Sequence, residues 1–170
     1  MAYVYMWFVL TRWNKCSKML LNALKSELPM HQILKMRLEQ AFALTADLVV
    51  HLEEADLRAE LPNLPSNRLS GQFWCVVGAR ESYITAIDAG SWQGFSCSLQ
   101  VVEDRDAVLA ALHVTAQRLA RIDFAALSDE QIRLAFELLE HEVQHHGQLI
   151  RFVYGNRLSF PASWNKRYTV

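Results

Sequence analysis

Two histidines one helical turn apart are the strongest candidates for chemistry in this chain. His141 and His145 lie in a stretch where Leu134, Leu138 and Phe152 recur at steps of three and four residues. That spacing is typical of the buried seam of a bundle helix. At about 100° per residue, the two imidazoles can converge on one point. Because two buried imidazoles are costly unless their nitrogens are satisfied, the pair predicts a site for a divalent metal.

Two polar neighbours of this pair are open to more than one interpretation. Gln148 falls on the same seam, where it is a candidate to hold a metal-bound water or to orient a ligand or substrate. A hydrogen-bonded core amide explains Gln148 equally well. His146 is rotated by about 100° from His145, so it is expected at the surface or behind the ligands.

The same run contains the H-E-x-x-H pattern of zinc proteases, with Glu142 as the general base. Such an enzyme needs a third ligand further along the chain. No Asp or Glu follows Glu142, and no His follows His146. Glu142 is also rotated away from the predicted seam. We therefore set the protease interpretation aside.

Long helices are expected to position these residues. Apolar repeats and capping signals place four of them at 33–54, 66–89, 104–121 and 128–154. Ser128 and Gln131 form a capping-box signature at the start of the last helix. Residues 91–103 are long enough to cross over between helices two and three. The sequence therefore predicts an all-α four-helix bundle with a long crossover between helices two and three, plus an extra N-terminal segment.

The composition is that of one globular domain. The chain has 170 residues, of which 52% are hydrophobic and 21% charged, and this excludes a disordered or fibrous protein. A net charge of −1 argues against binding to nucleic acid or to an anionic membrane through the overall charge of the molecule. Three cysteines at no paired spacing argue against a disulfide scaffold and favour the reducing cytoplasm.

The first thirty residues are interpreted as an N-terminal extension, with the bundle domain over 31–170. Residues 1–10 are apolar, but they are too short for a bilayer span of about 20 residues. They also lack the leading positive charge of a secretory signal. Three interpretations stay open: an added helix or strand packed on the domain, a non-native extension from an early start codon, and an inefficient membrane-targeting segment.

Residues 141–151 (HEVQHHGQLIR) resemble the final-helix motif of the DinB-like (damage-inducible, YfiT-like) family. In that motif two histidines four residues apart are followed by a Gly-Gln pair. Residues 77–83 and the tail at 160–168 resemble the family as well, and the similarity covers about 33–170. It implies a four-helix bundle that binds zinc or nickel and forms a homodimer. Relatives with known activity are thiol-dependent S-transferases or isomerases, and many others have no assigned reaction.

The third metal ligand is where this chain departs from the family. The resemblance implies a His on the second helix, but none occurs there, and Cys75 lies at or next to that position. A thiolate with two imidazoles is a known zinc set with one open position. A small core residue is the ordinary alternative for Cys75. His51 and His113 are other candidates, each more commonly a surface or partly buried histidine.

Arg80 and three aromatic residues complete the set of candidates. Arg80 lies on an otherwise apolar stripe, so we expect an ion pair to helix three or four, with anion or substrate binding near the metal as the alternative. Trp92, Phe95 and Trp164 are expected as lids over the bundle ends rather than as a substrate cage.

Two functional hypotheses follow. The first is a metal-dependent enzyme, a thiol-dependent S-transferase or a hydrolase, that acts on a small molecule at the open metal position. A low-molecular-weight thiol is its candidate cosubstrate. The second is a non-catalytic, stress-related bundle that has lost its metal and retains a dimer surface. Bound metal distinguishes the two.

Overall fold

The computed structural model of the chain describes residues 28–61 and 64–170. Over these ranges the regular secondary structure is helical and contains no strand, so the all-α prediction is confirmed there. None of the described helices is both long and apolar enough to cross a membrane. The three interpretations of the N-terminal segment concern residues 1–30, of which 1–27 lie outside the described ranges.

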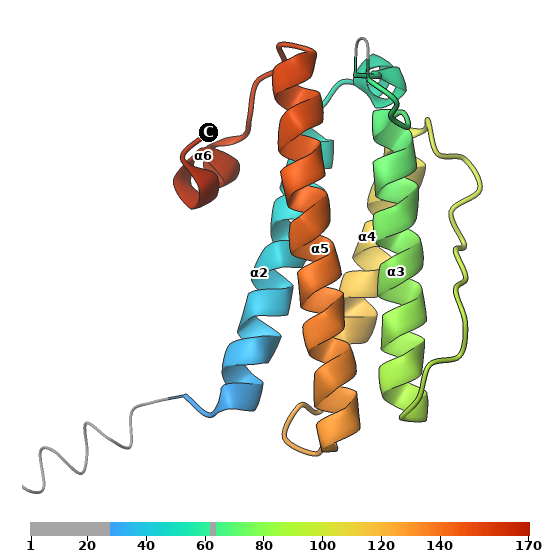
Figure 1. The fold of residues 1–170 in the computed structure, drawn as a ribbon, viewed down its shortest axis with the longest axis vertical. Helices are drawn as coiled ribbons and strands as arrows, with labels where there is room; N and C mark the ends of the chain where they lie inside the picture. The colour runs from blue at the N-terminus through green and yellow to red at the C-terminus, as the bar shows by residue number, and fades with distance from the viewer. Residues whose placement is uncertain (1–27, 62–63) are drawn as a thin grey trace, which may run out of the picture.

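Four long helices make up most of the described chain (Figure 1). They are α2 (Met30–His51), α3 (Leu69–Ala89), α4 (Arg105–Ala120) and α5 (Asp129–Gly155). A 3₁₀ helix, η1 (Glu54–Arg58), follows α2, and a short helix, α6 (Ala162–Tyr168), follows α5. Each predicted boundary of the long helices lies within about three residues of the observed one, which is the usual uncertainty of helix ends predicted from sequence.

Local signals account for where these helices begin and end. The Asp104 carboxylate accepts a hydrogen bond from the Ala107 amide at 2.9 Å, which caps the start of α4. The predicted capping box of Ser128 and Gln131 is present at the start of α5. The helix α3 ends at Gly90, whose φ of 74° lies in the left-handed region that glycine adopts at little cost.

The long helices lie side by side, and α2 and α5 run in one direction while α3 and α4 run in the other (Figure 1). Contacts join α3 to α5, α2 to α4, α2 to α5 and α3 to α4. Their buried side chains form two apolar clusters, one around Leu48, Phe73 and Trp164 and one around Leu38 and Ile84. The buried side chains of Arg80, Glu142 and His146 fall between members of the two clusters along α3 and α5.

The chain crosses over between α3 and α4 along the length of α3 (Figure 1). Gly78 permits this close approach, because a Cβ atom there would lie 2.3 Å from the ring of Phe95. The Ser82 hydroxyl accepts a hydrogen bond from the Ser96 amide at 2.9 Å. The predicted crossover therefore exists, and side chains of α3 hold it in place.

The C-terminal tail belongs to the core. Trp164 on α6 is 0% exposed, and its Nε1 donates a hydrogen bond to the Leu44 carbonyl at 2.6 Å. The expectation that Trp164 forms a lid over a bundle end is therefore wrong. The tail folds back so that α6 contacts α2, and the indole fills one of the two apolar clusters.

Candidate metal centre

Helices α3 and α5 bring Cys75, His141 and His145 together. The three residues each offer a ligand atom within 4.8 Å of the others. The sulfur of Cys75 lies 3.8 Å from Nε2 of His141, and the two imidazole centroids are 4.7 Å apart. Within residues 28–61 and 64–170, no other group of three or more His, Cys, Asp or Glu side chains is clustered in this way.

The site is buried on one side and open on the other. His145 is 7% exposed, whereas Cys75 and His141 are half-buried. On α3, Tyr83 stands beside the site, with its ring centroid 6.4 Å from that of His141. Trp92 of the crossover packs edge-on against Tyr83 at 5.0 Å. Cys75 and His141 are therefore partly accessible to solvent, and the aromatic pair lies close to His141.

The electrostatic environment favours neutral imidazoles and a protonated thiol while no cation is bound. Burial, with a smaller contribution from His141, lowers the pKa of His145 to about 4. Burial also lowers the pKa of His141, so both side chains keep a free lone pair at neutral pH. Burial raises the pKa of the Cys75 thiol. A metal must therefore displace one proton, from sulfur, when it binds.

The donor set fits a borderline-soft divalent ion. Bonds of about 2.3 Å to sulfur and about 2.0–2.1 Å to nitrogen would separate the ligand atoms of a tetrahedral zinc by about 3.3–3.6 Å. The separation of 3.8 Å between Cys75 and His141 is already close to this value. Thiolate and imidazole ligands also suit zinc and nickel better than magnesium or calcium.

Sequence reasoning assigned no function to one polar residue at this site. Gln72 lies on α3, one turn before Cys75, and is 9% exposed. Its Oε1 is 3.0 Å from Nδ1 of His145, within hydrogen-bond distance. The available signal was a polar residue on the face of α3 that also carries Cys75.

The buried seam of α5 differs from the predicted one. Its buried positions include Leu138, Glu142, His145 and Leu149, and Gln148 is exposed. A helix with 3.6 residues per turn drifts relative to a repeat of 3.5 residues. Because Glu142 is acidic, the predicted seam did not include position 142, which is buried. The seam position predicted for Gln148 is therefore wrong, and no hydrogen bond ties its exposed side chain to the ligands.

Glu142 is buried because Arg80 neutralises it. Arg80 Nε donates to Glu142 Oε2 at 2.9 Å, which confirms the predicted ion pair, and both side chains are nearly inaccessible, at 0% and 1% exposed. Burial by itself raises the pKa of Glu142, but Arg80 and His146 outweigh it and hold this pKa below its ordinary range. A buried, paired Arg80 cannot meet a substrate, and Glu142 cannot serve as a protease base.

His146 lies in the same buried layer rather than at the surface. It is 1% exposed, with Nε2 2.9 Å from the Thr45 hydroxyl and Nδ1 2.6 Å from the Tyr168 hydroxyl. The surface expectation for His146 is therefore wrong. The cause is α6, whose tyrosine provides a partner from a segment that the helical repeat of α5 does not reveal.

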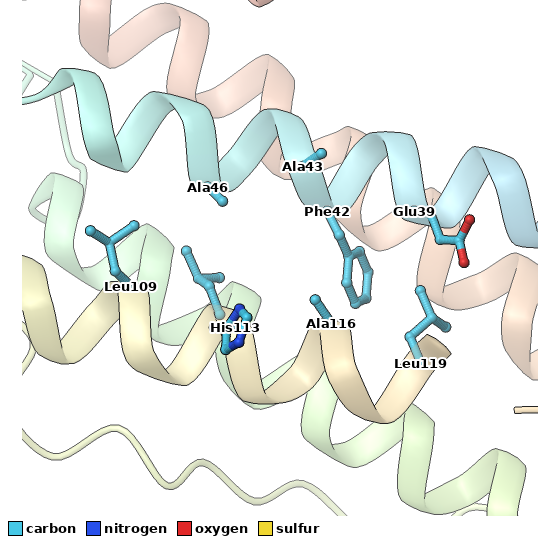
Figure 2. A pocket seen from close by; sticks show the side chains of 9 residues that line it. Glu39, Phe42, Ala43, Ala46, Leu109, His113, Ala116 and Leu119 are labelled. Carbon is cyan, nitrogen blue, oxygen red and sulfur yellow. The ribbon is translucent and has the colours of Figure 1, made fainter. Parts of the chain in front are cut away.

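The other histidines lie away from the centre. His51 is exposed and lies 2.9 Å from the Ser159 hydroxyl. His113 lines a separate hollow of about 360 Å³ between α2 and α4 (Figure 2). Ala43, Leu109 and Ala116 make most of that hollow apolar, and none of the three clustered ligands reaches it. Neither histidine belongs to the clustered set.

No protein-family model matches this sequence, and no curated protein matches it. The chemistry of the centre is therefore inferred from the described residues and from the motifs in the sequence.

Proposed function

We propose that this chain is a metal-dependent enzyme of the DinB-like kind, with a four-helix bundle that binds one zinc or nickel ion through Cys75, His141 and His145. The observation that carries the proposal is the approach of these three ligand atoms to within 4.8 Å of one another. The motif at 141–151 supports the family. Gln72, bonded to His145, supports a ligand role for that imidazole.

The chemistry proposed is group transfer to or from a thiol, or hydrolysis. Three protein ligands leave one position free, where a divalent ion supplies Lewis acidity and activates a thiol or water. The half-buried Cys75 and His141 give a small substrate access from outside, and Tyr83 and Trp92 form an apolar wall there. A low-molecular-weight thiol is the proposed cosubstrate. No general acid or base is assigned.

Two further proposals come from the sequence. The resemblance implies a homodimer, and the use of cysteine favours the cytoplasm. The competing function is a non-catalytic, stress-related dimerisation bundle that carries no metal. The missing histidine on the second helix is the observation that favours this alternative.

Metal content distinguishes the two functions. Protein purified without a chelator or an affinity tag should contain about one zinc or nickel ion per chain by elemental analysis. Cys75→Ser should lose most of this metal, since it removes the thiolate. Cys97→Ser is the matched control, because Cys97 is similarly half-buried but lies outside the clustered set.

Three results would count against the enzyme. A metal-free protein that also fails to take up added zinc would favour the non-catalytic bundle. A full equivalent of metal in Cys75→Ser would remove Cys75 from the ligand set. Equal loss of metal in Cys75→Ser and Cys97→Ser would point to a general effect of thiol removal rather than to a ligand.

A further inference from the structure

Gln72 links the two helices that carry the ligands. It lies three residues before Cys75 on α3, and its side chain reaches across to His145 on α5. The distance of 3.0 Å between Oε1 and Nδ1 is that of a normal hydrogen bond. Both residues are largely buried, at 9% and 7% exposed, so water competes little for this contact.

The partner at Nδ1 decides which nitrogen of His145 can bind a metal. A neutral imidazole carries one N–H group and one lone pair. An acceptor oxygen at Nδ1 places the proton there and leaves the lone pair on Nε2. If the amide of Gln72 were reversed, its NH₂ group would donate to Nδ1, and the proton would sit on Nε2.

We propose that Gln72 is a positioning residue that holds His145 with its proton on Nδ1, so that Nε2 is the metal-binding atom. This inference rests on the proposed function for its consequence, because the arrangement serves to present a ligand. The second partner of a metal-binding histidine fixes its ring orientation and tautomer, and losing that partner typically weakens metal binding about 10- to 100-fold.

The tautomer can be tested without any metal. In ¹⁵N-labelled, metal-free protein at neutral pH, long-range ¹H–¹⁵N correlation spectra show which ring nitrogen of His145 carries the proton. We expect the proton on Nδ1 in the wild type and a loss of this preference in Gln72→Leu. A wild-type proton on Nε2 would overturn the inference, whatever the metal content.

The affinity for zinc tests the consequence. Gln72→Leu keeps much of the side-chain volume but removes the acceptor, so its Kd for zinc should rise about 10- to 100-fold. Gln72→Glu keeps an acceptor oxygen and should bind zinc at least as tightly as the wild type. Gln144→Leu, at an exposed position on α5, is the control and should leave the Kd unchanged.

The outcomes separate this inference from the proposed function. Equal weakening by Gln72→Leu and Gln72→Glu would indicate a packing effect and overturn the role of the hydrogen bond, as would an unchanged Kd in Gln72→Leu. A wild type with the expected tautomer that binds no zinc would refute the metal function while supporting the hydrogen bond. If Gln72→Leu fails to fold, the wild-type spectra and Gln72→Glu still decide.

Discussion

At the scale of single residues, the Arg80–Glu142 pair governs how α5 faces its neighbours. The Thr45 hydroxyl donates a further hydrogen bond to Glu142 at 2.5 Å. Arg80 Nη1 has no hydrogen-bond partner, and the guanidinium carbon lies 3.7 Å from the centroid of the Phe42 ring. Since Glu142 directly follows His141, this pair also helps to keep the face of α5 that carries His141 turned toward α3.

Breaking this pair should be far more costly than replacing it. Arg80→Met or Glu142→Leu alone should each destabilise the metal-free protein by about 3–5 kcal/mol, because one buried charge is left unpaired. The double variant should lose less than the sum of the two single effects. Urea unfolding in the presence of chelator measures all three.

An exposed arginine supplies the control for that experiment. Arg133 pairs with Glu130 and Glu137 on the surface of α5, where its side chain is 56% exposed. Arg133→Met should therefore change the free energy of unfolding by less than about 1 kcal/mol. Strictly additive losses in the Arg80 and Glu142 double variant would contradict the paired account.

At the scale of elements, the short helix α6 stabilises the buried layer that contains His146. It buries Trp164 and places Tyr168 against His146. A helix of seven residues is too short to be stable by itself in water. Its structure must therefore come from these tertiary contacts.

Removing the indole should weaken the whole protein. Trp164→Ala leaves a cavity in an apolar cluster and should cost about 3–5 kcal/mol in urea unfolding. Trp92→Ala, at a position 50% exposed on the crossover, should cost much less. Similar losses in the two variants would contradict the assignment of α6 to the core.

At the scale of the whole molecule, the buried histidine couples stability to pH. The pKa of His145 is about 4 in the folded protein, whereas an unfolded histidine titrates near about 6.5. Between these values the unfolded chain binds a proton that the folded chain does not, so stability falls as the pH falls. The lowered pKa of Glu142 extends this loss below pH ~4.5.

The metal-free protein should thus keep its stability above about pH 7. Between pH ~6.5 and ~4 its free energy of unfolding should fall by on the order of 1–2 kcal/mol through His145. This loss is smaller than the full pKa shift would give, because water at the open side of the site screens part of the charge. Urea unfolding across this range measures the slope. His145→Asn should flatten it, and His51→Asn, at an exposed position, is the control. The same slope in wild type and His145→Asn would refute this account.

The features that the sequence determined by itself are those set by local geometry. Helix boundaries follow from caps and stops such as Ser128 and Gly90, which act through neighbouring residues. The convergence of His141 and His145 follows from a spacing of four residues on one helix. The meeting of Cys75 with this pair also agrees with the prediction, which drew on a family resemblance for the ligand on helix two.

Only the tertiary structure decided which polar residues are buried. Glu142 lies in the core because Arg80, 62 residues away in the chain, neutralises it. His146 does so because Thr45 and Tyr168 offer partners from two other helices. Gln72 is buried with His145 of another helix as its partner, whereas Gln148 is exposed to solvent. A buried polar side chain needs a partner that satisfies it, and for Glu142, His146 and Gln72 this partner lies on another helix. The periodicity of a single helix carries no information about such a partner.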